Sequence, residues 1–108
     1  MLNIPKTLKI GWRNYTINQS EHKAGNNGGD LYGQIEYEKR QIYLYDKIDA
    51  DEKSVTVLHE VLHGIFYNMG NALREDENFV TALAENLYQV IKDNPEMFGK
   101  GKEQGDDN

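Results

Sequence analysis

The sequence predicts an α+β domain in which a small antiparallel sheet of two hairpins is followed by two packed helices. Apolar residues alternate with a period of two in the first half of the chain, and beyond residue 45 the period becomes about 3.6. Strands that precede helices in this way are typical of the α+β class. With 108 residues and 38% hydrophobic side chains, the chain can build one core, so we expect a single domain over residues 1–98.

The strands are expected in two pairs. Residues 7–17 predict the first hairpin, because apolar residues alternate on both sides of a glycine. Residues 18–30 are polar and rich in glycine, which predicts a mobile loop. The second hairpin is predicted over residues 32–45, with a charged tip at residues 38–41.

Two helices should follow the hairpins. The first is predicted from about residue 51 to residue 69, because Asp49 and Glu52 form a capping-box arrangement and Gly70 is a typical helix stop. The second is predicted over residues 75–92 and is ended by an Asn-Pro pair. The tail at residues 99–108 is polar and acidic, so we expect it to be disordered.

The composition excludes several classes of function. A net charge of -6, a pI near 5.0 and scattered basic residues argue against a nucleic-acid partner, since phosphate binding requires clustered lysine and arginine. The sequence shows neither a signal peptide nor a run long enough to span a membrane, so we expect no membrane partner and a cytoplasmic location. Because cysteine is absent, any metal must be bound by nitrogen and oxygen ligands.

One motif on the first predicted helix carries chemistry. His59 and His63 are four residues apart, and this spacing places both imidazoles on the same side of a helix. Glu60 lies about 100° around the helix from His59, where it would reach a water on a bound cation instead of the cation itself. This pattern predicts a Zn²⁺ site with Glu60 as general base. The alternative is that both histidines are ordinary structural residues.

A catalytic zinc needs a third protein ligand, and here it must be a carboxylate, because no histidine follows His63. Glu77 is favoured, since it lies at the margin of the apolar stripe of the second predicted helix. Asp76 and Glu85 remain possible ligands, although Asp76 is expected to cap the helix. Glu75 points away from the stripe and is disfavoured.

Three stretches of the chain resemble a known family. They are the His-Glu-x-x-His motif at residues 59–63, the segment 77–84 and the hairpin at residues 32–44, and the likeness extends over about residues 32–95. They are similar to the minimal gluzincin-type metallopeptidases grouped with ImmA/IrrE and related phage and mobile-element proteins. The resemblance implies a zincin-like fold and a protein or peptide substrate, because family members cleave regulatory proteins such as repressors.

By the same resemblance, His59, His63 and Glu77 would bind zinc and Glu60 would be the base. The group that stabilises the oxyanion is left open, with Tyr67 and His22 as candidates that no motif supports. We expect a peptidase whose substrate adds a strand to the sheet. The second hypothesis is a catalytically weak or inactive module of the same fold that sequesters a protein partner, and a DNA mimic is a remote third.

Overall fold

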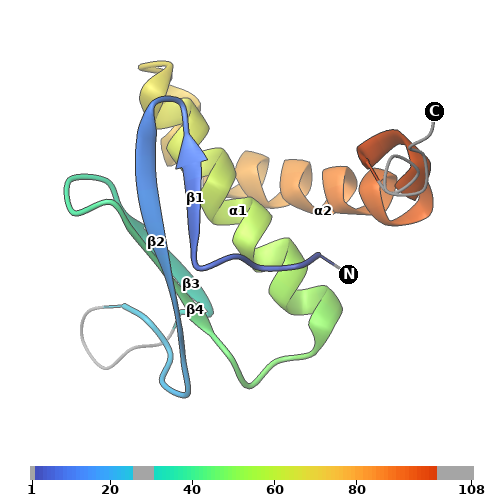
Figure 1. Ribbon diagram of the computed structural model, residues 1–108. Helices are drawn as coiled ribbons and strands as arrows, with labels where there is room; N and C mark the ends of the chain where they lie inside the picture. The colour runs from blue at the N-terminus through green and yellow to red at the C-terminus, as the bar shows by residue number, and fades with distance from the viewer. Residues whose placement is uncertain (1, 26–30, 100–108) are drawn as a thin grey trace.

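The computed structural model describes residues 2–25 and 31–99 and confirms the α+β class. Four strands come first and helices follow, as Figure 1 shows. The glycine-rich part of the expected loop at residues 26–30 and the tail at residues 100–108 lie outside the described residues. The elements are β1 (Thr7–Ile10), β2 (Arg13–Ser20), β3 (Gly33–Glu36), β4 (Gln41–Tyr45), α1 (Ala50–Asn68), the 3-10 helix η1 (Ala72–Glu75), α2 (Glu77–Asp93) and the 3-10 helix η2 (Pro95–Phe98).

Both expected hairpins are present, but the sheet is not fully antiparallel. β1 pairs with β2 and β3 pairs with β4 in antiparallel fashion, whereas β2 and β4 lie side by side in parallel, which gives the order β1-β2-β4-β3. The two predicted hairpins are confirmed, and the parallel pair that joins them was not predicted. Alternation of apolar residues indicates which face of a strand is buried, and it carries no information on the direction of the neighbouring strand.

The parallel pairing also changes where the loop begins. β2 extends to Ser20, although a loop was expected from residue 18, because β4 supplies backbone partners as far as the pair Ser20 and Tyr45. Ile17 lies beside Ile42 in this register, and both side chains are buried. β3 is left at the outer edge of the sheet, next to the site described below.

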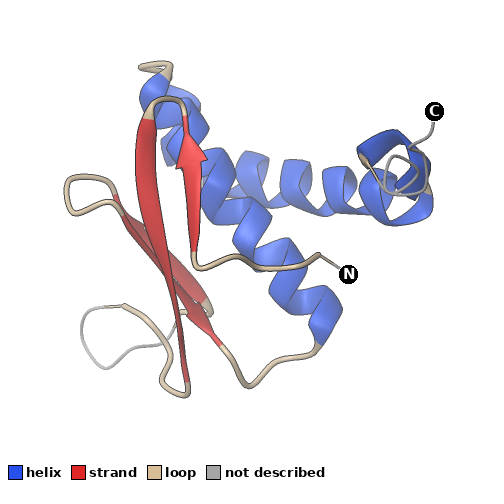
Figure 2. Ribbon diagram, in the orientation of Figure 1, coloured by secondary structure: helices blue, strands red, loops and turns tan. Residues whose placement is uncertain are grey.

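The core lies between one face of the sheet and α1, and α2 packs on the side of α1 that faces away from the sheet (Figure 2). Gly64 allows this close packing, because a Cβ at that position would lie 2.8 Å from Ile10 Cδ1 and 3.3 Å from Ile35 Cδ1. The buried residues of the main cluster come from β1, β2, β4 and α1: Ile10, Tyr15, Ile17, Ile42, Leu44 and Val57.

The first helix has the predicted ends. The Asp49 side chain accepts a hydrogen bond from the Glu52 backbone N–H at 2.8 Å, and Gly70 follows the helix with φ of 65°, a conformation that favours glycine. The second helix begins later than the predicted residue 75, because Asp76 is its N-cap and residue 75 belongs to η1. Among the described residues, no helix is both long and apolar enough to cross a membrane.

Candidate metal centre

The two histidines of the motif project from the middle of α1 toward the start of α2. Their side chains are largely buried, with 19% of His59 and 7% of His63 exposed. The ring centroids lie 4.8 Å apart, and the ring planes are tilted by 58°. Because the residues are one helical turn apart, the two Nε2 atoms approach to 3.0 Å. The helix thus presents two imidazole nitrogens at one point.

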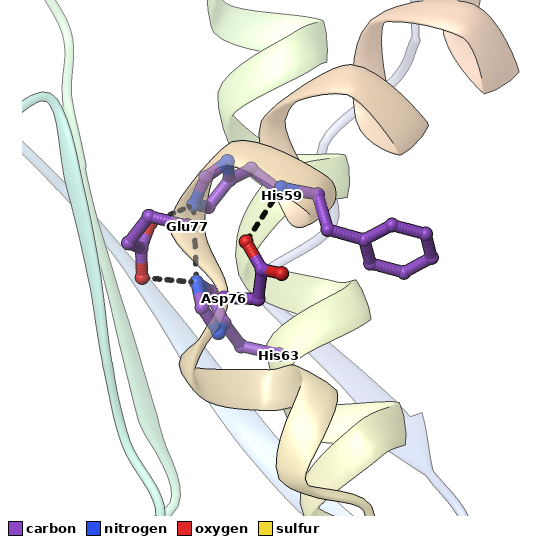
Figure 3. Close-up of polar contacts among 5 residues, drawn as sticks. His59, His63, Asp76 and Glu77 are labelled. Carbon is purple, nitrogen blue, oxygen red and sulfur yellow. Dashed lines mark hydrogen bonds and ion pairs between the residues drawn. The ribbon is translucent and has the colours of Figure 1, made fainter.

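Glu77 completes a triangle of donor atoms. It is the first residue of α2, and its Oε1 lies 3.0 Å from His59 Nε2, while its Oε2 lies 3.0 Å from His63 Nε2 (Figure 3). Within residues 2–25 and 31–99, this is the one group of three His, Cys, Asp or Glu side chains close enough to bind a single ion. The structure therefore brings together the three residues that the sequence favoured as ligands.

The dimensions of the triangle suit a tetrahedral cation. Zinc bonds of about 2.0–2.1 Å to nitrogen and oxygen place two tetrahedral ligand atoms roughly 3.3 Å apart. The two imidazole nitrogens are 3.0 Å apart, close to this value, and with one Glu77 oxygen the three ligand atoms lie within 4.8 Å of one another. Two imidazoles and one carboxylate are also a donor set that zinc prefers when sulfur is absent, and they leave a fourth position for water. The residues present thus fit a catalytic type of zinc site.

The other acidic candidates have different roles. Asp76 Oδ1 accepts a hydrogen bond from the Phe79 backbone N–H at 3.1 Å, and its carboxylate caps α2 (Figure 3). Glu75 pairs with Arg74 at 3.4 Å. Glu85 lies two turns further along α2, in the wall of the adjacent cavity and outside the triangle. Among these carboxylates only Glu77 lies beside the histidines.

Glu60 is buried next to this triangle, with 6% of its surface exposed. Burial, and second the charge of Glu77, raise the pKa of Glu60 to about 8. A divalent cation nearby would act in the opposite direction. With a pKa of about 8 the Glu60 carboxyl is mostly protonated at neutral pH, and a bound divalent cation would favour the carboxylate that a general base requires.

Burial also affects the ligands. The pKa of His59 lies below its usual value, chiefly because of burial and then because of His63, although Glu77 acts in the opposite direction. A lowered pKa keeps the imidazole neutral at physiological pH. The neutral form has the free lone pair that metal binding requires.

A cavity of about 750 Å³ opens beside the triangle. One wall is α1 with His59, Glu60 and His63, and the opposite wall is the edge strand β3. Gly33 brings β3 close to α1, since an added Cβ would lie 3.1 Å from Glu60 Oε2 and 2.6 Å from Thr56 Cγ2. A strand at the edge of a sheet offers backbone groups to an extended peptide. The cavity thus combines the candidate ligands with an edge strand of the sheet.

Two residues in the cavity wall were missed by the sequence reasoning. Tyr37 and Arg74 line the cavity, whereas neither Tyr67 nor His22 is among its lining residues. The ring of Tyr37 stacks on Tyr67, with centroids 4.1 Å apart and an interplanar angle of 3°. Burial, followed by the charge of Glu60, raises the pKa of Tyr37 to about 12, so its hydroxyl stays protonated and can donate a hydrogen bond.

The alternation of the second hairpin could have predicted the position of one of these two residues. Tyr37 continues the alternation of Ile35 on the second hairpin, which places both on the same face of the sheet. Arg74 lies on η1, a short segment without periodicity, and nothing in the sequence indicated its position.

Comparison of the chain with protein-family models, with curated proteins and with solved structures gave no match. The functional interpretation therefore rests on the residues and their geometry.

Proposed function

We propose that this protein is a zinc-dependent metallopeptidase that hydrolyses a peptide bond in an extended segment of a protein substrate. The supporting observation is the triangle of His59, His63 and Glu77, which adjoins a buried Glu60 and an edge strand in one cavity. The resemblance to gluzincin-type peptidases agrees with this proposal. The cytoplasmic location expected from the sequence is part of the same proposal.

Each residue of the site has a separate role in the proposed hydrolysis. Zinc bound by His59, His63 and Glu77 would supply a Lewis acid for the scissile carbonyl and would acidify a water. Glu60 accepts the proton of the attacking water on a carboxylate oxygen and then returns it to the leaving amine. β3 orients the substrate through backbone hydrogen bonds. Tyr37 lines the same cavity with a protonated hydroxyl, and this hydroxyl would donate a hydrogen bond to the oxyanion that develops during hydrolysis.

Zinc content and activity of three purified, untagged proteins test the proposal. The wild type should contain about one zinc per chain, and His59→Ala should lose it. Glu60→Gln should keep the zinc but lose at least about 100-fold in the hydrolysis of a fluorogenic peptide library, because only the base is removed. A wild type without zinc after incubation with Zn²⁺, or a Glu60→Gln variant with full activity, would overturn the proposal.

A second function is favoured by exposed apolar side chains on η2. In the part of the chain that the structure describes, Met97 and Phe98 are exposed to 71% and 47%. A binding module that sequesters a protein through this surface is the alternative. In that case Glu60→Gln would leave the biological effect unchanged, whereas Met97→Asp would abolish it.

A further inference from the structure

All three arginines and the single tryptophan of the chain lie in one row of alternating cations and rings. Arg40 Cζ and Arg13 Cζ lie 5.1 Å and 4.4 Å from the Trp12 ring centroid. Arg13 Cζ also lies 5.9 Å from the Tyr67 ring, and Arg74 Cζ lies 5.8 Å from the same ring. We call Arg40, Trp12, Arg13, Tyr67 and Arg74 the arginine–aromatic row.

The fold holds this row in place from four separate segments. Trp12 lies in the turn between β1 and β2, Arg40 in the turn between β3 and β4, Tyr67 at the end of α1, and Arg74 on η1. Figure 1 shows the β1–β2 turn close to the end of α1. Asn68 ties these parts together, because it accepts a hydrogen bond from Arg13 Nη1 at 2.7 Å and donates one to the Ile10 carbonyl at 2.9 Å.

Much of the row is available to a partner. Trp12 is 69% exposed, although a tryptophan normally covers most of its ring. Within the described part of the chain, neither Arg13 nor Arg40 forms an ion pair with a carboxylate. Arg13 uses Nη1 for Asn68, and Arg74 pairs with Glu75 at 3.4 Å. The remaining edge N–H groups of the guanidiniums over the rings can bind other acceptors, and their geometry matches the two oxygens of a carboxylate.

From this arrangement we propose that the arginine–aromatic row is a docking surface for an acidic segment of the protein substrate. Charge complementarity identifies the occupant, because a chain with a net charge of -6 places all of its arginines on this one surface. Tryptophan, tyrosine and arginine are also the residues that contribute most to binding at protein interfaces. Three arginines are few for a nucleic-acid partner, because that binding depends on many phosphate contacts with clustered lysine and arginine.

The row is continuous with the candidate active site. Arg74 belongs to the row and lines the cavity, and Tyr37 lines the cavity while it stacks on Tyr67 of the row. A bound acidic segment would therefore place the adjoining part of the same polypeptide at the cavity. The inference rests on the proposed function and adds the chemistry of the substrate to it.

Trp12 makes a direct binding test possible, since its fluorescence is the only tryptophan signal of the chain. The experiment uses zinc-loaded, full-length Glu60→Gln protein so that the probe is not cleaved. A twelve-residue peptide of alternating glutamate and serine should change the emission in a saturable way, and the change should weaken with added salt. A peptide of alternating glutamine and serine should have no effect.

Matched variants locate the binding. In the same background, Arg40→Gln should lower the affinity for the acidic peptide about fivefold or more, because it removes a charge-assisted contact. Lys47→Gln removes the same charge from an exposed position beyond the other end of β4, and should leave the affinity unchanged. Arg40→Lys keeps the charge without the planar fork and should fall between the two. Circular dichroism of each variant confirms that it is folded.

Several results would overturn the docking proposal. One is that the glutamine peptide binds as tightly as the acidic peptide, and another is that Arg40→Gln and Lys47→Gln bind the acidic peptide with equal affinity. A third is that a twelve-residue oligothymidylate binds more tightly than the acidic peptide. The last is an emission change on dilution of the protein alone, which would indicate a second copy as the occupant. Binding of the acidic peptide by a protein that fails the zinc and hydrolysis tests would overturn only the peptidase. If the protein is an active peptidase but does not bind the acidic peptide, only the docking proposal is overturned.

Discussion

At the scale of single residues, the candidate chemistry depends on how two helices place three side chains. The histidines are fixed by the regular geometry of α1, whereas Glu77 is fixed by the place where α2 begins. Asp76 determines that place, because its side chain caps the helix and leaves the next residue to face the histidines. Two neighbouring carboxylates therefore have separate places: one caps α2, and the other contacts the histidines.

Substitution separates these two roles. Glu77→Ala should lower the zinc affinity at least about 100-fold, because one of three ligands is lost, and it should leave the helix cap intact. Asp76→Ala should keep zinc binding and lower the free energy of unfolding by about 1 kcal/mol. Competition with a chelator gives the affinity, and urea unfolding of the zinc-free proteins gives the stability. Loss of zinc in Glu85→Gln instead of Glu77→Ala would contradict this assignment.

At the scale of elements, β3 and α1 form the two walls of the cavity, and their spacing is set by small side chains. The contact is made where Gly33 meets Thr56, one turn of α1 before Glu60. The Thr56 hydroxyl donates to the Glu52 carbonyl at 2.8 Å, which holds the side chain in one rotamer. The methyl group of Thr56 therefore cannot easily move aside for a larger residue at position 33.

Gly33→Ala should consequently destabilise the protein by about 1–3 kcal/mol, the usual cost of overpacking, because its Cβ would lie 2.6 Å from Thr56 Cγ2. Thr56→Ser removes that methyl group and keeps the hydroxyl, so the double variant should recover most of the loss. Urea unfolding of the four proteins gives the coupling energy of the pair. Additive effects of the two substitutions would show that this contact does not limit the spacing.

The elements also show what the sequence could and could not predict. The cap at Asp49, the stop at Gly70 and the spacing of the histidines depend on neighbours in the chain, and local patterns predicted them. The parallel pairing of β2 with β4 and the position of Arg74 depend on contacts between distant segments. Periodicity does not encode such contacts, and this is why the parallel strand pair and part of the cavity wall were not predicted.

At the scale of the whole molecule, α1 and α2 pack through the cluster of Leu62, Val80 and Ala84, and polar contacts join them near both ends of α2. Glu77 meets the histidines at the start of α2, and near its end Tyr88 donates a hydrogen bond to Asp51 Oδ1 at 2.6 Å, with Lys92 Nζ 3.3 Å from Oδ2. The hydrogen bond from Tyr88, followed by that from Lys92, holds the pKa of Asp51 below its ordinary value. The ionised carboxylate thus joins the first turn of α1 to α2.

This junction should make the free energy of unfolding depend on pH in the acidic range. Because the pKa is lower in the folded state, the contribution of Asp51 is present above its unfolded pKa of about 3.9 and is lost as the pH falls through the folded value. The stability difference between wild type and Asp51→Asn should therefore stay constant down to about pH 5 and shrink as the pH falls further. Urea unfolding across this range measures it, with Glu96→Gln on η2 as the control. A difference that stays constant with pH would contradict the role of Asp51.

Zinc would strengthen the junction that Glu77 forms with the histidines, and this gives a test at the level of the entire fold. A ligand that binds only the folded state at 100 times its Kd stabilises that state by about 2.7 kcal/mol. For a domain of this size, the corresponding rise in Tm is roughly 10 °C. The rise should appear in wild type and in Glu60→Gln, reverse with a chelator, and be absent in His59→Ala and Glu77→Ala. This measurement does not require catalysis, so it tests zinc binding separately from peptidase activity. Stabilisation only of the proteins that keep all three ligands would support the zinc site. Equal stabilisation of His59→Ala would contradict it.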